Sequence, residues 1–428
     1  MKNKKQIENL KWDKLDNTAN LFPVIAKEGT TNVYRISVIL NEDVDEGKLQ
    51  EALDIILPYF DVFRNRMKQG LFWYYFETNI KKPPTVQKEI TYPCQYINPN
   101  VNRDYLFRVS YFKKRINLEV FHSVTDGSGA INFLKELTYQ YLRLVHVELA
   151  KEMGDYLDSS TSLNHDDSYM KNYIGKEKKN YRTIRAVELR GRSFPIDEIG
   201  VIQGIVPVSE IKVVAKRFGL TINEYIVGTY AWAIYHSYLK EKTSKQPISI
   251  NVPVDLRPFF DSNTNKNFFA MISAVFLPEK EHYTRNEVIE IISKNLKEQI
   301  TKENLSRILG YNVSNETNLV LRAVPLFIKK IALRHVYNSS AKANTTTVSN
   351  VGIVKVPQEY ESYIDRFTAM LSRSKGQNMK CVICSFMDKM TISFTSNLLS
   401  SDIQKDFFRQ LSNDGISISI ETNGAYYE

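Results

Sequence analysis

One histidine in the chain stands where a general base could act. His122 ends the run INLEVFHS, in which every second residue from Ile116 onward shares one face of a predicted strand. The sequence SVTDGSG follows directly, so the strand leads into a glycine-containing turn that carries Asp126 and Gly127. This arrangement places an imidazole at the rim of a sheet, close to a carboxylate that can fix the turn.

Such an imidazole suits one kind of chemistry. A histidine with a pKa near neutrality can take the proton of an alcohol, amine or thiol while that group attacks an acyl carbon. The tautomer must be fixed, often by a backbone carbonyl close to Nδ1. The alternative is a buried core histidine followed by an ordinary turn, and the spacing alone leaves both interpretations open.

The other histidines and the cysteines carry no comparable pattern. Structural or solvated roles are expected for His146, His165, His236, His282 and His335. Cys381 and Cys384 form a CxxC inside the apolar run KCVICSFM, which is typical of a strand and not of a thioredoxin-like helix start. A zinc site needs four ligands, and Cys94 is far away in sequence. We therefore predict core cysteines and no metal site.

The composition is that of a folded globular protein. Hydrophobic residues make up 43% and charged residues 25% of the 428 residues, which excludes a disordered or fibrous chain. The net charge of +9 would suit nucleic acid, an anionic membrane or a phosphate-bearing cofactor. The basic residues are dispersed, however, and no RNP-type motif, zinc finger or basic helix occurs, so we expect no nucleic-acid partner.

The sequence also bears on location. The start MKNKKQIENLKWDKL has a basic head but lacks the apolar core of a signal peptide. No stretch approaches the roughly 18–20 apolar residues that cross a bilayer. Three cysteines are too few for a disulfide framework. We expect a cytoplasmic protein without a transmembrane segment.

Helices and strands alternate in a similar order in two parts of the chain, which predicts an α/β fold with mixed sheets. The stretch 156–195 is polar, charged and nearly aperiodic, and indicates a linker. We therefore expect an N-terminal half over 1–155 and a C-terminal half over 196–428. Among the expected elements are strands at 33–41, 70–79, 247–256, 268–278 and 345–357, and helices at 130–150, 285–302 and 316–336.

The segment FHSVTDGSGA resembles the HxxxDG motif of the chloramphenicol acetyltransferase-like superfamily, which includes condensation domains of peptide synthetases and alcohol acetyltransferases. Further segments similar to members of this group are DNTANLFP, GLFWYYFE, FGLTINEYIVGTYAWAI, NVPVDLRPFF and NVGIVKVP. The resemblance thus covers most of the chain. Phe121 precedes the motif where many condensation domains double the histidine, and the DFGWG segment of plant acyltransferases is missing. Both departures favour the alcohol acetyltransferase-like branch.

The resemblance implies two chloramphenicol acetyltransferase-like half-domains in a pseudo-symmetric arrangement around a central tunnel. It implies that His122 is the general base and that Gly127 keeps room beside it. It further implies that Asp126 is structural and paired with an arginine, for which Arg257 in VDLRP is the candidate. SNVGI stands in the place of DFGWG, so Asn350 is the candidate oxyanion or acceptor contact.

The implied activity is that of a CoA-dependent O- or N-acyltransferase. It would move an acetyl or another short acyl group from acyl-CoA, a cosubstrate, to a small-molecule alcohol or amine, with no permanently bound cofactor. Two alternatives stay open. One is a catalytically silent binding protein of the same fold. The other is a discrete condensation-type enzyme that takes thioesters from a carrier protein, which would then be a partner.

Overall fold

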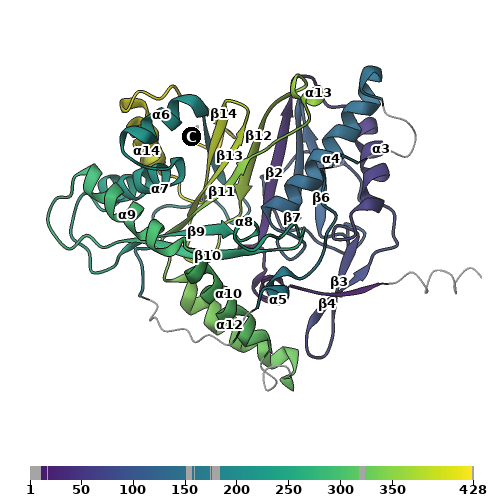
Figure 1. Ribbon diagram of the computed structural model, residues 1–428, viewed down its shortest axis with the longest axis horizontal. Helices are drawn as coiled ribbons and strands as arrows, with labels where there is room; N and C mark the ends of the chain where they lie inside the picture. Colours follow the sequence, from purple (N-terminus) through teal and green to yellow (C-terminus); the bar gives the residue numbers. More distant parts are fainter. Residues whose placement is uncertain are drawn as a thin grey trace, which may run out of the picture.

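The computed structural model describes residues 11–16, 18–150, 157–158, 160–173, 175, 184–317 and 323–426. These residues form two sheet-containing parts that lie side by side (Figure 1). The predicted linker over 156–195 falls partly outside the described residues, and the proposed boundaries at 155 and 196 stay predictions.

A five-stranded sheet with the order β12-β2-β7-β6-β5 forms the part drawn on the right of Figure 1. Its strands are β2 (Val33–Leu40), β5 (Gln87–Lys88), β6 (Phe107–Phe112), β7 (Arg115–Phe121) and β12 (Ile364–Leu371). The helices α3 (Glu46–Ile56) and α4 (Gly127–Val145) share one apolar core with these strands and cover one face of the sheet. The order β7, turn, α4 confirms the strand and helix predicted on either side of the motif.

A seven-stranded sheet with the order β10-β9-β11-β13-β14-β8-β15 forms the other part. Its strands are β8 (Gly200–Pro207), β9 (Ile248–Asp255), β10 (Phe269–Phe276), β11 (Thr346–Ile353), β13 (Met379–Phe386), β14 (Lys389–Ser396) and β15 (Ser419–Thr422). The helices packed on it are α6 (Val208–Arg217), α7 (Ile222–Ala233), α9 (Arg285–Gln299) and α14 (Asp402–Asn413). A capping box formed by Thr221 and Glu224 opens α7.

One strand from late in the sequence completes the first sheet. β12 pairs antiparallel with β2 and then continues through residues 372–378 into β13 of the seven-stranded sheet. On β13, Val382 and Cys384 belong to the core of the five-stranded part, whereas Cys381 and Ile383 belong to the other core. Both cysteines of the CxxC are buried and free, which confirms the prediction of core cysteines.

The remaining elements include two differences from the sequence prediction. The strand expected over 70–79 is confined to Tyr74–Thr78, because residues 70–73 connect it to the preceding strand. The helix expected over 316–336 lies at Leu326–Ala341 (α12), and an unpredicted helix, α10 (Lys302–Thr317), precedes it. A small three-stranded sheet joins β1 (Trp12–Lys14), β3 (Asn65–Gln69) and β4 (Tyr74–Thr78). Short helices are α2 (Phe22–Ile25), α5 (Ser168–Lys171), α8 (Arg257–Phe260) and α13 (Gln358–Glu361). Within the described ranges, no helix has the length and apolar character to cross a membrane.

Candidate active site

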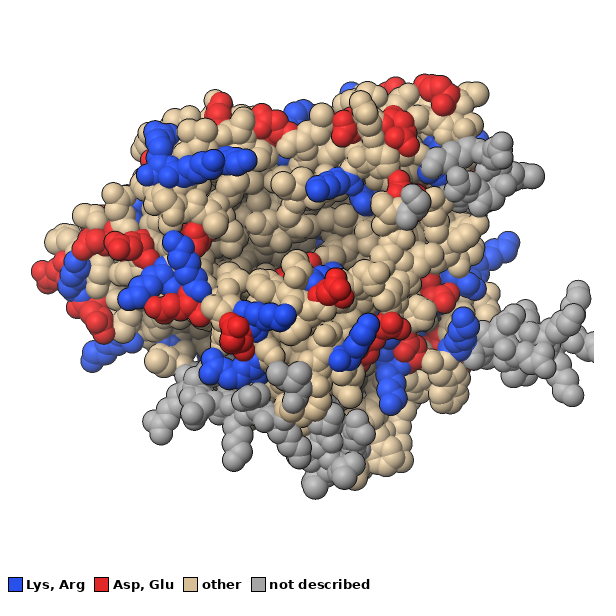
Figure 2. Space-filling model, viewed as in Figure 1, with Lys and Arg blue, Asp and Glu red and all other residues tan. Residues whose placement is uncertain are grey.

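A cavity of about 460 Å³ lies between the two sheets. Its wall draws on β2 and the turn after β7 from one part, and on β9, β10, β11 and α12 from the other. Figure 2 shows a hollow in this region, with mainly uncharged walls and charged side chains around its rim. The residues singled out in the sequence all line the cavity: His122, Asp126, Gly127, Arg257 and Asn350.

The imidazole of His122 is held between aromatic rings. The backbone N–H of His122 donates to the carbonyl of Asn32 over 2.9 Å, directly after β7 ends. The ring is half-buried and stacks on Phe22, with centroids 4.6 Å apart, while Tyr34 is tilted against it at 4.8 Å. Removal from water lowers the pKa of His122 below its usual value. The imidazole is therefore neutral at pH 7, in the form that can accept a proton.

Two residues that the sequence did not single out complete the surroundings of this histidine. His122 Nδ1 lies 3.2 Å from Asn267 Oδ1, and Asn267 Nδ2 donates to Asp16 Oδ2 over 2.9 Å. Because the amide nitrogen of Asn267 faces the carboxylate, its oxygen faces the imidazole and accepts a hydrogen bond from the Nδ1–H group. The lone pair of His122 Nε2 is then the one available for a substrate proton.

Asp126 holds the turn and does so through several donors. Its Oδ1 accepts the N–H groups of Ser128 and Gly129, at 3.1 and 3.3 Å, which caps the start of α4. Arg257 Nη2 lies 3.0 Å from both carboxylate oxygens, and the N–H of Phe268 donates to Oδ2 over 2.9 Å. The carboxylate is 5% exposed and joins the two parts of the molecule.

Arg257 extends the same network within the second part. Its Nε donates to the carbonyl of Thr264 over 2.9 Å, and its Nη2 donates to that of Lys266 over 2.8 Å. Its Nη1 pairs with Asp255 at 2.9 Å. These bonds fix the segment that carries Asn267. The contact expected between Arg257 and Asp126 is thus present. The purely structural role expected for Asp126 stays a prediction.

The two glycines of the turn differ in their surroundings. A Cβ on Gly127 would meet no heavy atom within 4 Å, and since Gly127 lines the cavity, a side chain there would take space from it. A Cβ on Gly129 would lie 2.0 Å from Thr125 Oγ1 and 2.4 Å from the carbonyl oxygen of Asn265. At Gly129, α4 therefore passes so close to Asn265 of the second part that a side chain has no room.

Asn350 lies on β11, exposed at the cavity wall. Its Oδ1 accepts the N–H of Gly352 over 2.9 Å, where the pairing of β11 with β13 shifts register. That bond uses the amide oxygen and leaves the amide N–H groups free to turn toward a ligand. The oxyanion contact assigned to Asn350 stays a prediction.

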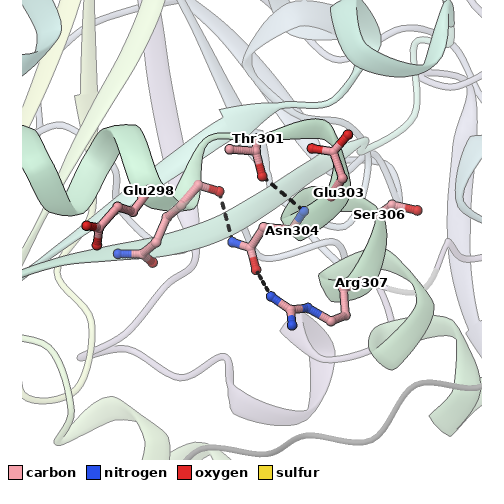
Figure 3. Close-up of a pocket in the computed structure, with 7 residues that line it drawn as sticks. Glu298, Thr301, Glu303, Asn304, Ser306 and Arg307 are labelled. Carbon is pink, nitrogen blue, oxygen red and sulfur yellow. Dashed lines mark hydrogen bonds between the residues drawn. The ribbon is translucent and has the colours of Figure 1, made fainter.

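A second hollow lies at the corner between α9 and α10 (Figure 3). Asn304 occupies its centre, where its Nδ2 donates to the carbonyl of Gln299 over 2.9 Å and its Oδ1 accepts from Arg307 over 2.8 Å. Its backbone N–H donates to Thr301 Oγ1 over 3.2 Å. Its polar groups therefore serve to turn the chain between two helices. Across the described ranges, no group of three or more His, Cys, Asp or Glu is placed to hold a metal ion.

Comparison with known proteins finds likeness at the level of structure. No protein-family model matches the chain, and no curated protein matches it. TRI101 of F. sporotrichioides, solved with coenzyme A and T-2, superposes with a TM-score of 0.62 at 10% identity, covering 95% of this chain and 99% of that one. The first condensation domain of the calcium-dependent antibiotic synthetase, solved with a substrate analogue, gives a TM-score of 0.61 at 13% identity, covering 94% and 96%.

A third similar structure is polyketide synthase associated protein 5 from Mycobacterium tuberculosis, with a TM-score of 0.57 at 13% identity over 93% of this chain and 96% of that one. These likenesses define the class of fold. The chain has the two-lobed fold shared by chloramphenicol acetyltransferase-like proteins and condensation domains, which confirms the fold predicted from the sequence.

Proposed function

We propose that the protein is an acyltransferase that uses His122 as its general base. The observation that carries this proposal is the available Nε2 of His122 in the cavity between the lobes, with Nδ1 held by Asn267 and Asp16. The fold adds support, since TRI101 has the same architecture and its structure contains coenzyme A. The donor proposed here is acyl-CoA, and the acceptor is a small alcohol or amine.

The reaction is a direct transfer. His122 Nε2 takes the proton of the acceptor O–H or N–H as that atom attacks the thioester carbonyl carbon, and the carbonyl oxygen becomes an oxyanion. The amide N–H of Asn350 is the candidate donor to that oxyanion, a contact worth about 3–4 kcal/mol in comparable sites. The carbon–sulfur bond then breaks, and the CoA thiolate takes the proton from Nε2. The products are the ester or amide and free CoA, and His122 is neutral again.

The size and lining of the cavity bear on the substrates. Its volume of about 460 Å³ and its largely uncharged wall suit a small molecule. We propose an acetyl or another short acyl group. A second candidate donor is a carrier-protein thioester, favoured by the likeness to condensation domains. The chemistry at His122 would be the same, and only the donor differs.

Release of free thiol tests this proposal. Acetyl-, butyryl- and hexanoyl-CoA would be offered with pooled alcohols and amines, and acylated carrier protein would be offered in parallel. Because general base catalysis contributes about 10²- to 10⁴-fold, His122→Ala should lower transfer by that factor while the protein still folds and unfolds cooperatively at the assay temperature. The matched control is His165→Ala, since His165 is exposed on the surface. Equal rates for wild type and His122→Ala refute the base assignment, and no transfer from any thioester leaves a silent binding protein.

A further inference from the structure

The wall of the cavity contains a second ionisable side chain, Lys380. It lies on β13, is 8% exposed, and lines the same cavity as His122. Side chains alternate along a strand, so Lys380 shares a face with Val382 and Cys384. Those two residues pack into the core of the five-stranded part. Lys380 therefore points from one sheet toward the other, across the space between the two parts.

The ammonium group of Lys380 has few partners. Its Nζ donates to Ser374 Oγ over 2.5 Å. In the portion of the chain that the structure describes, no carboxylate pairs with it, and the titratable groups that interact with its charge include the thiol of Cys94 and the imidazole of His122. Burial raises the pKa of Cys94 to about 12, so this thiol is neutral at pH 7. The positive charge of Lys380 thus has no counter-charge.

Neutral side chains line the cavity wall near Lys380, namely Thr347, Ser372, Ser374 and Gln377. Lys375 also lines the cavity, but it is exposed and its Nζ donates to Asn338 Oδ1 over 2.9 Å. Thr347 donates to Gln377 Oε1 over 2.7 Å, which leaves the Gln377 amide N–H groups available. An ammonium has three N–H donors, and Ser374 accepts one of them. This part of the wall therefore offers several donors and one buried positive charge to a ligand in the cavity.

A buried charge without a partner is destabilising, and a ligand of opposite charge removes that penalty. Burial lowers the pKa of Lys380 to about 8, so the ammonium form still predominates at pH 7. One cation surrounded by neutral donors matches a group with a single negative charge. A carboxylate has this charge, and its two oxygens can accept from the ammonium and from a neighbouring hydroxyl or amide together.

We propose that Lys380 and its neutral neighbours form a subsite for a carboxylate that is carried by a substrate. The subsite rests on the proposed function and narrows the substrate class: either the acyl group or the acceptor bears a free carboxylate. The carboxylate accepts a hydrogen bond from Nζ while the reacting atom lies at His122 in the same cavity.

Binding of inert ligand pairs tests the subsite apart from catalysis. For the acyl side, S-(3-carboxypropyl)-CoA is compared with S-butyl-CoA. Both are thioethers without a thioester carbonyl, so neither can transfer an acyl group. For the acceptor side, phenyllactate is compared with phenyllactamide. A charge-assisted hydrogen bond predicts that wild type binds the carboxylate of one pair about tenfold tighter or more, as measured by titration calorimetry.

Lys380→Met should abolish that preference and leave the Kd of the neutral partner unchanged, with Lys380→Gln as the second variant if Tm falls. The control is Lys405→Met, which removes an exposed lysine on α14. Three results overturn the subsite: no preference in either pair, a preference that survives in Lys380→Met, or equal weakening of both thioethers, which would assign Lys380 to the CoA moiety.

The two proposals fail separately. His122→Ala should lose transfer and keep the carboxylate preference. Preference without any acyl transfer in wild type overturns the proposed function alone. Transfer without preference overturns the subsite alone.

Discussion

Two cations with little exposure to solvent, Arg257 and Lys380, lie on the wall of one cavity and differ in almost every contact. Arg257 bonds to the carboxylates of Asp126 and Asp255 and to two backbone carbonyls. Lys380 bonds to one hydroxyl, that of Ser374. The guanidinium of Arg257 donates from all three of its nitrogens and links the two parts. The ammonium of Lys380 donates to Ser374 and has further N–H donors for a ligand. This difference separates a structural charge from one that can bind a ligand.

Arg257→Met gives the largest expected effect. The change removes one partner from a buried ion pair and leaves Asp126 without its counter-charge, which typically destabilises by about 3–5 kcal/mol. Thermal and urea unfolding at pH 7 measure the loss. Arg185→Met is the control, because Arg185 is half-exposed in a surface pair with Glu188 at 3.8 Å and should change stability by less than about 1 kcal/mol. Equal effects of the two substitutions would remove the contrast.

Asp16→Asn tests the network behind His122. Burial raises the pKa of Asp16 to about 7, although the Asn267 hydrogen bond opposes the shift. The unfolded carboxyl ionises near its ordinary pKa, so between about pH 4 and 7 the folded state binds more protons and wild type loses stability as pH rises. Each unit of pKa shift corresponds to about 1.4 kcal/mol, so the free energy of unfolding of wild type should fall by a few kcal/mol over this pH range. Asp16→Asn should not show this fall.

The same substitution has a second readout. The N–H of Ala19 donates to Asp16 Oδ1 over 2.8 Å, so an amide at position 16 keeps its oxygen on that side and turns its N–H groups toward Asn267. Asn267 then reverses and offers N–H to His122 Nδ1. The proton of the imidazole then moves to Nε2, and transfer should fall about 10²-fold or more. Nitrogen-15 NMR of labelled histidine reports the tautomer. An unchanged tautomer in Asp16→Asn contradicts the positioning role.

Gly129→Ala should have an intermediate effect. The added methyl overlaps Thr125 and the backbone of Asn265, and overpacking of this kind costs about 1–3 kcal/mol. Gly127→Ala is the matched control, because its Cβ meets open space. That variant should unfold like wild type while its ligands bind less tightly. A stable Gly129→Ala would show that the contact between the parts has room to adjust.

Lys380→Met should change stability least. Replacing a buried cation that has no carboxylate partner by an apolar side chain of similar length is neutral or stabilising, within about 1 kcal/mol at pH 7. Burial lowers the pKa of Lys380 to about 8. Above that pH the unfolded lysine binds more protons than the folded one. The free energy of unfolding of wild type should therefore rise relative to that of the variant up to about pH 10. A large loss at pH 7 would place Lys380 with Arg257 as a structural cation.

Sequence reasoning found the parts of the site that lie in one segment. His122, Asp126 and Gly127 fall within a single strand, turn and helix start, where strand periodicity and turn chemistry indicate their positions. Asn267 lies 145 residues from His122, and Asp16 lies 251 residues from Asn267. Both are in polar loops without periodicity, and although Asp16 opens the segment DNTANLFP, no local pattern gives either residue a role beside His122. Folding alone brings them together.

Lys380 and β12 were missed for different reasons. In KCVICSFM the period of two places Lys380 on an apolar face, so a signal was present: a charge at a core position of a buried strand. β12 carries the charged residues Asp365 and Arg366 near its start, and its partner strand β2 is more than three hundred residues earlier. Its place in the first sheet depends on long-range pairing that no local pattern contains.

The crossing of β12 has a consequence for how the chain can be divided. A polypeptide that stops at the predicted linker would leave β2 with an open edge, and an open edge pairs readily with other chains. The second piece would carry a strand with no sheet to join. The two predicted halves should therefore depend on each other to fold, because the first sheet includes a strand, β12, from late in the sequence. The loop after β12 leads directly to Lys380, so the strand that couples the halves also shapes the cavity between them.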